Sequence, residues 1–352
     1  MIFNSAKKVI LKEIKEKGDI SFKRFMEICL YHPKYGYYRS VKKLGREGDF
    51  FTSAHLGSIL GKVIAKVAET YFEDDDTQVH VIELGAGEGL LAKDFLDFFA
   101  RENIDKYSKI TYHIVEGNEA VYGEIEKNLK EHSSKFVTYS SMEELPSLPN
   151  VFIFSNEFFD AFPVHIVSKK KGILSELYIG YKDGVYVKRF KLPSKEVVKE
   201  VEELNIEVCE DCEFEINSDI ESVYRLLSDK FQKFKMVTID YGYGQEELYH
   251  PERKKGTIMG YYKHKAYDNV FQFEGEMDIT SHVNFDALIH YGRKYGIESI
   301  YFKNQRTFLL DNGLFEVLKE GEELSLKDSF QLKTLLLPNS MGDIFRVLIQ
   351  KK

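Results

Sequence analysis

The chain has 352 residues, a formal net charge of −8, and 43% hydrophobic and 14% aromatic residues. This length is long for one domain and short for three, and the apolar share is ample for a packed core. The negative charge argues against a general nucleic-acid-binding protein, and no apolar run reaches the ~18 residues that a membrane-spanning helix needs. We therefore expect neither nucleic-acid binding nor stable membrane insertion.

The first 75 residues are predicted to form helices around one structured loop. Apolar positions recur at helical spacing in three stretches, 9–14, 22–30 and 56–71. Ser21 is expected to cap the second helix, and Thr52 or Ser53 the third.

The next stretch, 79–84, is an apolar run that leads into glycines at alternate positions, Gly85, Gly87 and Gly89. An amphipathic run then begins at Leu90, so the pattern predicts a strand, a tight turn and a helix. The turn leaves room for a ligand where a side chain would stand. A dinucleotide site would need its third glycine at Leu90. The pattern E-x-G-x-G-x-G resembles instead the first motif of class I S-adenosylmethionine (SAM) methyltransferases.

A second nucleoside signal follows at the end of the next predicted strand. Residues 110–115 lead into Glu116, and an acid at this position can accept hydrogen bonds from both ribose hydroxyls, as it also does in NAD sites. The alternative is a helix-packing turn beside a surface acid. On the nucleoside interpretation, the candidate cofactor-binding residues of this part of the chain are Glu83, Gly85, Ala86, Gly87, Gly89, Glu116, Gly117 and Asn118.

From Gln78 onward, predicted strands and helices alternate as a doubly wound α/β sheet requires. The strands are expected at 79–84, 110–116, 136–140, 151–155, 236–241, 297–302 and 343–350, with the last beside the sixth. A hairpin is predicted around Asp183-Gly184. The expected domains are an N-terminal helical cap (1–76), a core (77–167 and 221–352) and an inserted substrate or partner region (168–220), with a second excursion at 244–283.

Polar residues cluster where two of these strands end. Asn156, Glu157 and Asp160 follow the strand at 151–155, and Asp240 ends the strand at 236–241. Ligands sit at this edge of an open α/β sheet. Three carboxylates around one pocket suit a cationic acceptor such as a guanidinium, and a paired acid could accept the proton that it must lose. Asn156 and Asp160 could instead cap a helix. No metal is needed for methyl transfer to such an acceptor.

Cys209 and Cys212 form a lone C-x-x-C in an acidic setting. No further zinc ligands lie at a familiar spacing, and neighbouring acids oppose a lowered thiol pKa, so we expect two reduced thiols. The N-terminus carries acids at Glu13 and Glu16 and has the pattern of neither a secretory signal nor a transit peptide. These features together predict a cytoplasmic protein.

Several longer motifs resemble the MidA family, whose mitochondrial members are complex I assembly methyltransferases. The resemblance runs from about Phe22 to Gln350. The matching segments are 31–38 (YHPKYGYY), 48–53 (GDFFTS), 83–89, 156–165 (NEFFDAFPVH), 239–242, 260–264, 278–280 and 341–342. The segments at 48–53 and 156–165 are much more specific than the glycine turn.

The resemblance implies a class I (Rossmann-like) methyltransferase with a seven-stranded, mostly parallel sheet, an N-terminal helical extension and an inserted α+β substrate region. It implies SAM as the cofactor and an arginine of a complex I-type protein subunit as the acceptor, and it leaves a homodimer open. Gly85, Gly87, Gly89 and Glu116 would then hold SAM, while Asn156, Glu157 and Asp160 would line the acceptor pocket. A further set would fold over the cofactor, namely Gly48, Asp49, Phe50, Thr52 and Ser53.

The sequence departs from the family at two positions. Ala54-His55 stands where Pro-Glu is common, which removes an acid from the expected cofactor cover, and Glu88 replaces a basic residue. Two other functions remain open at this point. One is an assembly protein that keeps SAM as a structural ligand, and the other is a nicotinamide-dependent oxidoreductase.

Overall fold

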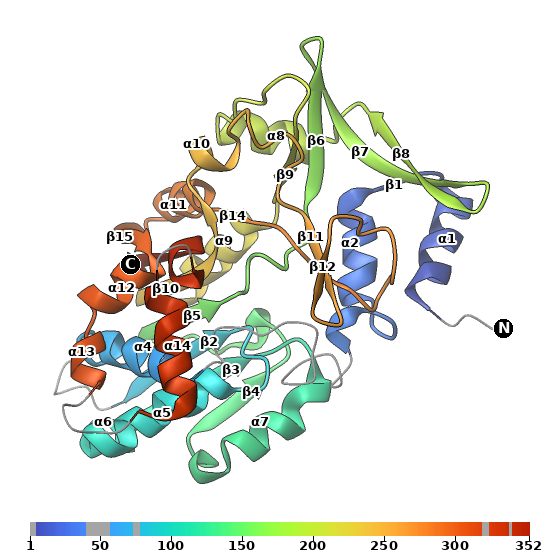
Figure 1. Cartoon of the computed structure of the whole chain (residues 1–352). Coiled ribbons are helices and arrows are strands. Elements are labelled where there is room, and N and C mark those ends of the chain that lie inside the picture. Colours follow the sequence, from blue (N-terminus) through green and yellow to red (C-terminus); the bar gives the residue numbers. More distant parts are fainter. Residues whose placement is uncertain (1–4, 40–56, 73–77, 319–323, 338–339) are drawn as a thin grey trace. The chain divides into compact units, whose positions relative to one another are not determined.

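The computed structural model of the chain describes residues 5–39, 57–72, 78–318, 324–337 and 340–352 (Figure 1). The chain divides into two compact units. The first unit comprises 1–50, 159–222 and 242–291, and the second comprises 51–158, 223–241 and 292–352. Each unit is described by itself below.

The second unit is built on a seven-stranded sheet with the order β15-β16-β10-β5-β2-β3-β4. The strands are β2 (Val79–Leu84), β3 (Ile110–Val115), β4 (Phe136–Tyr139), β5 (Asn150–Asn156), β10 (Lys233–Tyr243), β15 (Glu298–Asn304) and β16 (Phe345–Lys351). The pairs that join β4, β3, β2, β5 and β10 are all parallel, while β16 runs antiparallel to both of its neighbours. The predicted α/β fold, with the last strand beside the sixth, is confirmed.

The strands at the centre of this sheet are buried on both faces, as a parallel sheet covered by helices requires. All six residues of β2 are buried, and Val151 to Phe154 of β5 are fully enclosed. On one side, Phe95 of α5 (Leu90–Glu102) stacks on Phe154 with ring centroids 6.1 Å apart. The sheet is therefore rigid where its strands end, which is the edge that carries the candidate site.

The other helices of this unit are α4 (Ile59–Glu69), α6 (Ile104–Lys109), α7 (Tyr122–Asn128), α12 (Gln305–Asp311), α13 (Leu314–Val317), α14 (Leu326–Leu336) and α15 (Met341–Ile344). The third predicted helix corresponds to α4. Its first backbone N–H groups are bound by side chains of α14, since Ser58 N–H donates to Asp328 Oδ1 (2.7 Å) and Ile59 N–H to Gln331 Oε1 (2.8 Å). The predicted caps, Thr52 and Ser53, lie outside the described residues.

The first unit has a sheet in the order β1-β7-β6-β9, with β8 paired to β7. Its strands are β1 (Ile20–Ser21), β6 (His165–Lys170), β7 (Ile173–Lys182), β8 (Val185–Lys191) and β9 (Glu213–Ile216), with helices α1 (Ala6–Lys17), α2 (Phe22–Tyr31), α8 (Lys195–Glu203) and α10 (Gln245–Leu248). Ser21 caps α2 by accepting the Arg24 N–H (3.2 Å), as predicted. The β7–β8 hairpin turns at Asp183 and Gly184, both with positive φ, which the sequence also predicts.

The excursion at 244–283 supplies a small sheet of three strands, β11 (Met259–Tyr262), β12 (Lys265–Tyr267) and β13 (Asp278–Thr280). Its residues share one hydrophobic core with α1, α2, β6 and β7. Phe271, for example, packs against Phe25 of α2 with ring centroids 5.2 Å apart. The units therefore differ from the expected domains, because the N-terminal helices, the insertion and this excursion bury their apolar faces in one core.

Two helices lie where the chain passes between the units in sequence, namely α9 (Ile220–Lys230) and α11 (Phe285–Lys294). The short strand β14 (Val283–Asn284) belongs to the first unit. Gly242 and Tyr243, at the end of β10, pair in parallel with β14. Among the described helices, none is long and apolar enough to cross a membrane.

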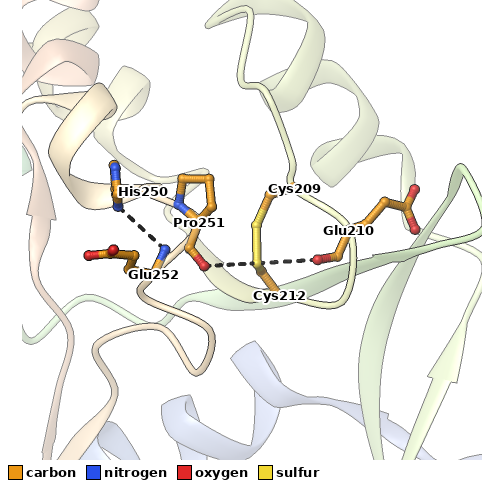
Figure 2. The surroundings of a disulfide bond; sticks show 6 residues. All are labelled: Cys209, Glu210, Cys212, His250, Pro251 and Glu252. Atoms are coloured by element: carbon orange, nitrogen blue, oxygen red, sulfur yellow. Dashed lines mark hydrogen bonds between the residues drawn. A yellow bond between two sulfur atoms is a disulfide. The ribbon is translucent and has the colours of Figure 1, made fainter.

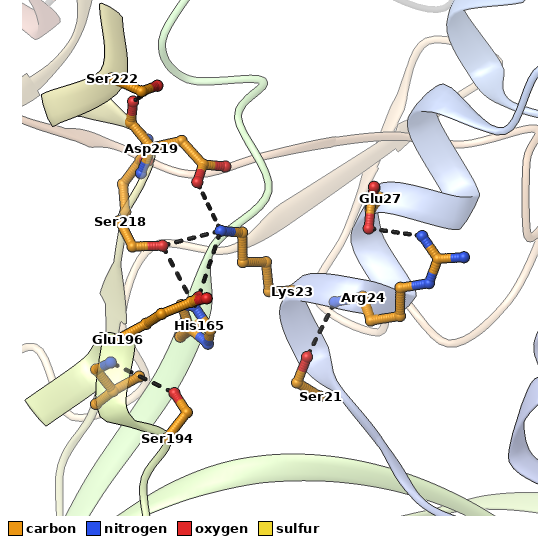
Figure 3. Close-up of polar contacts among 12 residues, drawn as sticks. Ser21, Lys23, Arg24, Glu27, His165, Ser194, Glu196, Ser218, Asp219 and Ser222 are labelled. Carbon is orange, nitrogen blue, oxygen red and sulfur yellow. Dashed lines mark hydrogen bonds and ion pairs between the residues drawn. The ribbon is translucent and has the colours of Figure 1, made fainter. Parts of the chain in front are cut away.

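A polar network ties α2 to the sheet of the first unit (Figure 3). The Lys23 ammonium lies 2.9 Å from Ser218 Oγ and 2.6 Å from Asp219 Oδ1. His165 Nδ1 lies 2.7 Å from Glu176 Oε1, and both side chains are buried. Burial alone would raise the pKa of Glu176, but hydrogen bonds from His165 and the Ser194 N–H hold it below its usual value. A buried carboxylate is thus compensated within the unit.

The two cysteines of the C-x-x-C motif form a disulfide, so the expectation of reduced thiols is wrong (Figure 2). Their Cα atoms are 5.8 Å apart, which is within the usual range for a disulfide. Cys212 is buried in a small apolar cluster with Ile206 and Phe214, and its Sγ lies 3.8 Å from the Pro251 carbonyl oxygen. A C-x-x-C motif can bind zinc, act as a redox pair or form a short disulfide crosslink, and the third of these is found here.

Candidate cofactor and acceptor site

The glycine turn after β2 has the backbone conformation for which glycine is needed. Gly85, Gly87 and Gly89 have φ values of 72°, 54° and 74°, in the left-handed region. A Cβ on Gly85 would lie 2.9 Å from the Phe158 ring, whereas a Cβ on Gly87 would meet nothing within 4 Å among the described residues. Gly85 is therefore required for packing, and Gly87 leaves open space beside the turn.

The Glu116 carboxylate holds this turn in place. Gly87 N–H donates to Glu116 Oε2 (2.9 Å), and Asn118 N–H donates to Glu116 Oε1 (2.8 Å). A carboxylate has about four lone-pair sites, and an acid at the end of this strand can accept hydrogen bonds from ribose hydroxyls. The predicted strand-end acid is thus beside the predicted glycine turn.

Asn118 offers an unused donor at the same place. Its side-chain oxygen accepts the Ala120 N–H (3.2 Å), while its Nδ2, although buried, has no hydrogen-bond partner within the described part of the chain. A buried donor without a partner is costly and commonly awaits a ligand or water. The open side of Gly87, the lone pairs of Glu116 and this amide together fit the polar edge of a nucleoside.

Glu83 is placed differently from the other predicted cofactor residues. Its side chain is 2% exposed and accepts a hydrogen bond from the Tyr112 hydroxyl (2.7 Å). Burial, with the carboxylates of Glu116 and Asp94 nearby, raises the pKa of Glu83 to about 8. Glu83 is therefore a neutral, buried acid at pH 7, and it lies in the strand that leads into the glycine turn. Tyr112, its partner, was missed because a tyrosine inside a strand gives no functional signal.

The residue after β5 has a strained backbone. Glu157 has a φ of 53°, and its N–H donates to the Ile239 carbonyl (3.0 Å). A side chain in the left-handed region costs about 1–2 kcal/mol relative to glycine. The Glu157 carboxylate also accepts a hydrogen bond from Asn156 Nδ2 (3.1 Å). The left-handed backbone and this hydrogen bond together fix where the Glu157 carboxylate lies at the end of β5.

Asp240 is fully buried and acts on the backbone of the same turn. Its Oδ2 accepts the Phe158 N–H (3.1 Å), and its Oδ1 accepts the N–H of Tyr241 (2.9 Å). This geometry supports a positioning role for Asp240. Phe158 is half-buried and covers Gly85.

The structure brings most of the predicted site together within the second unit. Asn156, Glu157 and Asp240 are linked by the contacts above. Asp160 belongs to the first unit, where it is buried and its carbonyl accepts the Ser281 N–H (3.0 Å). The predicted cofactor cover lies outside the described residues: Gly48, Asp49, Phe50, Thr52 and Ser53.

Comparisons with known proteins identify the ligand that fits this arrangement. Residues 59–303 match the family model described as "Putative S-adenosyl-L-methionine-dependent methyltransferase". A crystal structure of a Burkholderia thailandensis protein bound to S-adenosyl-homocysteine superimposes with a TM-score of 0.88 and 26% identity, over 99% of this chain and 91% of that one. The glycine turn and Glu116 are therefore the expected binding elements for the same cofactor.

Curated relatives match nearly the whole of this chain and most of their own length. The protein arginine methyltransferase NDUFAF7 of Rattus norvegicus is 27% identical and covers 96% of this chain and 82% of its own length. The Caenorhabditis elegans homologue is 28% identical, over 97% and 84%. Both are named as mitochondrial proteins, which contradicts the expectation of a cytoplasmic location. That expectation rested on the pattern of the N-terminus, which does not determine where the chain resides.

Proposed function

This chain belongs to the family of S-adenosyl-L-methionine-dependent methyltransferases, and we propose that it methylates an arginine side chain of a protein. The resemblance to the MidA family and the prediction of SAM as cofactor are both confirmed. The nicotinamide alternative is excluded by family membership. Arginine as acceptor is supported by the names of the relatives, which are protein arginine methyltransferases.

The observation that carries this proposal is the strained Glu157 at the end of β5. When bound, SAM supplies an electrophilic methyl carbon on a sulfonium. A guanidinium has a pKa above ~12. As one of its nitrogens bonds to the methyl carbon, the carbon–sulfur bond would break and S-adenosylhomocysteine would leave as a neutral thioether, so this nitrogen must give up a proton in the course of the transfer. We assign the acceptance of that proton to the Glu157 carboxylate. The Asn156 amide orients this carboxylate, and Asp240 fixes the backbone that presents it.

The cofactor would be held by the turn at Gly85–Gly89, the Glu116 carboxylate and the free amide of Asn118. The role in the acceptor site that the motif predicts for Asp160, a residue of the first unit, stays a prediction. By resemblance to the family, the acceptor in this proposal is a subunit of a complex I-type enzyme, and the homodimer that the sequence leaves open stays a prediction. The assembly-protein alternative predicts SAM binding without methyl transfer.

Two measurements on one pair of variants test the proposal. Glu157→Gln keeps the size of the side chain but removes the proton acceptor, so it should bind SAM as the wild type does in calorimetry and transfer no methyl group. Glu131→Gln, which changes an exposed acid elsewhere in the same unit, is the matched control and should retain both properties. Normal transfer by Glu157→Gln would contradict the role assigned to this residue. SAM binding without transfer by the wild type would favour the assembly protein.

A further inference from the structure

The β7–β8 region of the first unit has a charge opposite to that of the protein as a whole. Residues 169–195, called the basic hairpin here, contain eight basic and two acidic residues, in a chain with a net charge of −8. The basic residues are Lys169, Lys170, Lys171, Lys182, Lys188, Arg189, Lys191 and Lys195. Such a local reversal of sign favours contact with an acidic partner.

Part of this charge is not neutralised within the unit. Arg189 and Lys191 form ion pairs with Asp19, at 2.7 and 2.8 Å. Lys170, Lys171 and Lys182 are exposed, and none of them forms an ion pair within the described part of the chain. These three lysines are thus available to a partner.

The hairpin also offers a strand edge. β8 pairs with β7 along its whole length and with no other strand among the described residues. Lysines on an edge strand often serve only to prevent aggregation. The three lysines without ion pairs lie at the two ends of the hairpin instead, Lys182 at the end of β7 and Lys170 and Lys171 at the β6–β7 turn. Large aliphatic side chains are exposed at the same two ends, with Val185 at 61% opposite Lys182, and Ile173 at 63% and Leu192 at 80% at the other end. A purely protective edge would not carry them.

From these observations, we propose that β8 docks an extended acidic segment of the protein substrate as an added strand. Main-chain hydrogen bonds to the free edge would supply affinity, and the lysines and aliphatic side chains at the two ends of the hairpin would select acidic and apolar residues in the segment. The inference rests on the proposed function, because it needs a protein substrate. Nucleic acid is the less favoured partner, since exposed aliphatic side chains do not stack on bases and the rest of the chain is acidic.

A synthetic peptide tests this docking without SAM and without methyl transfer. The probe is a fluorescein-labelled ten-residue peptide of alternating Glu and Val, and its anisotropy is titrated with the full-length protein. We expect saturable binding that weakens as salt is added, because the charges are exposed. The same peptide with alternating Lys and Val should not bind. A version with N-methylated main chain at alternate residues, on the edge facing β8, should also lose binding.

The protein variants are matched in charge. The triple variant Lys170→Glu, Lys171→Glu, Lys182→Glu should bind the acidic peptide at least about tenfold more weakly. It loses three exposed ion pairs with the peptide, and each pair contributes ~0.5 kcal/mol or more. The triple variant Lys12→Glu, Lys127→Glu, Lys130→Glu makes the same change of net charge elsewhere and should bind like the wild type. Both should bind SAM normally, which reports on folding.

Three outcomes would overturn the docking surface. The first is that the wild type does not bind the acidic peptide. The second is that both triple variants lose the same amount of peptide affinity. The third is that the wild type binds a single-stranded oligouridylate and that only the hairpin variant loses this binding. Failure of the proposed function looks different, because it would appear as absent arginine methylation while peptide binding is intact. If the surface is correct, the hairpin variant should raise the KM for a protein substrate and leave turnover of a short arginine peptide unchanged.

Discussion

The N–H of Gly87 donates to the Glu116 carboxylate at 2.9 Å, which joins the glycine turn after β2 to the end of β3. The two motifs that predict a nucleoside site are therefore joined by a direct hydrogen bond. Glu116 serves two purposes in this account. It fixes the turn through the Gly87 and Asn118 amides, and it is the acid that would bind the ribose hydroxyls.

We expect Glu116→Gln to weaken SAM binding by about 10- to 100-fold, since a hydrogen bond to a charged group contributes ~1.5–3 kcal/mol. The amide can accept one of the two backbone N–H groups but not both. Calorimetric titration with SAM measures the change. The control is Glu119→Gln, which alters an exposed acid three residues away and should bind SAM normally. Wild-type affinity in Glu116→Gln would remove this residue from the site.

Gly87→Ala separates backbone strain from ligand binding. Both Gly87 and Gly172 have positive φ values, and a Cβ on either would meet nothing within 4 Å among the described residues. Alanine at each position should therefore reduce stability similarly, by about 1 kcal/mol. Only Gly87→Ala should also weaken SAM binding, because its methyl group would enter the space beside the turn. Thermal melts and SAM titrations of the two variants give the comparison, and equal SAM affinity would argue that this space is not used.

Glu157→Gly should stabilise the protein while abolishing methyl transfer. Glycine relieves the left-handed strain at φ 53°, which is a gain of about 1 kcal/mol. Lys171 has a φ of 52° in the β6–β7 turn, so Lys171→Gly should gain comparable stability and keep its turnover of a short arginine peptide. Denaturant unfolding and methylation assays of both variants test this exchange of stability for function. A loss of stability in Glu157→Gly would show that its side-chain contacts outweigh the strain.

The free energy of unfolding should fall as the pH rises from 4.5 to about 8. Over this range Glu83 is neutral in the folded state and ionised in the unfolded state. The folded pKa is about 8, above the unfolded value of 4.5, so folding takes up a proton between these values. This contribution is fully present below pH 4.5 and is lost as pH approaches 8. Asp94, with a pKa raised mainly by burial to about 7, acts in the same direction. Glu83→Gln should flatten the decline in melting temperature between pH 5 and pH 8.5, and an unchanged slope would contradict a buried neutral acid.

The strand and helix order of the sheet could be predicted because each element carries its own signal. A short, continuous apolar run predicts a buried strand, as at 79–84 and 151–155. Glycines at alternate positions predict a tight turn, as at 85–89. The grouping of segments into units could not be predicted, since it depends on which apolar faces share a core, as with Phe25 and Phe271. The Cys209–Cys212 crosslink was missed for a related reason, because a short C-x-x-C serves several structures equally well.

Within the site, the residue types were predictable but several roles were not. Asp240 has the predicted position, yet its oxygens bind backbone amides of Phe158 and Tyr241, which only a folded turn reveals. The left-handed backbone of Glu157 likewise leaves no trace in the sequence, where a glycine would have given one. Glu83 looks like its neighbours in the motif but is buried against Tyr112.

The central claim is that this chain transfers a methyl group from SAM to arginine, with Glu157 as the proton acceptor. The most direct test incubates the purified protein with SAM carrying a trideuterated methyl group and a denatured-and-refolded mixture of proteins from cells that lack the gene, followed by mass spectrometry of the peptides. The account predicts the label on arginine with the wild type and no label with Glu157→Gln, which still binds SAM. Label confined to residues other than arginine, or equal labelling by the two proteins, would contradict it.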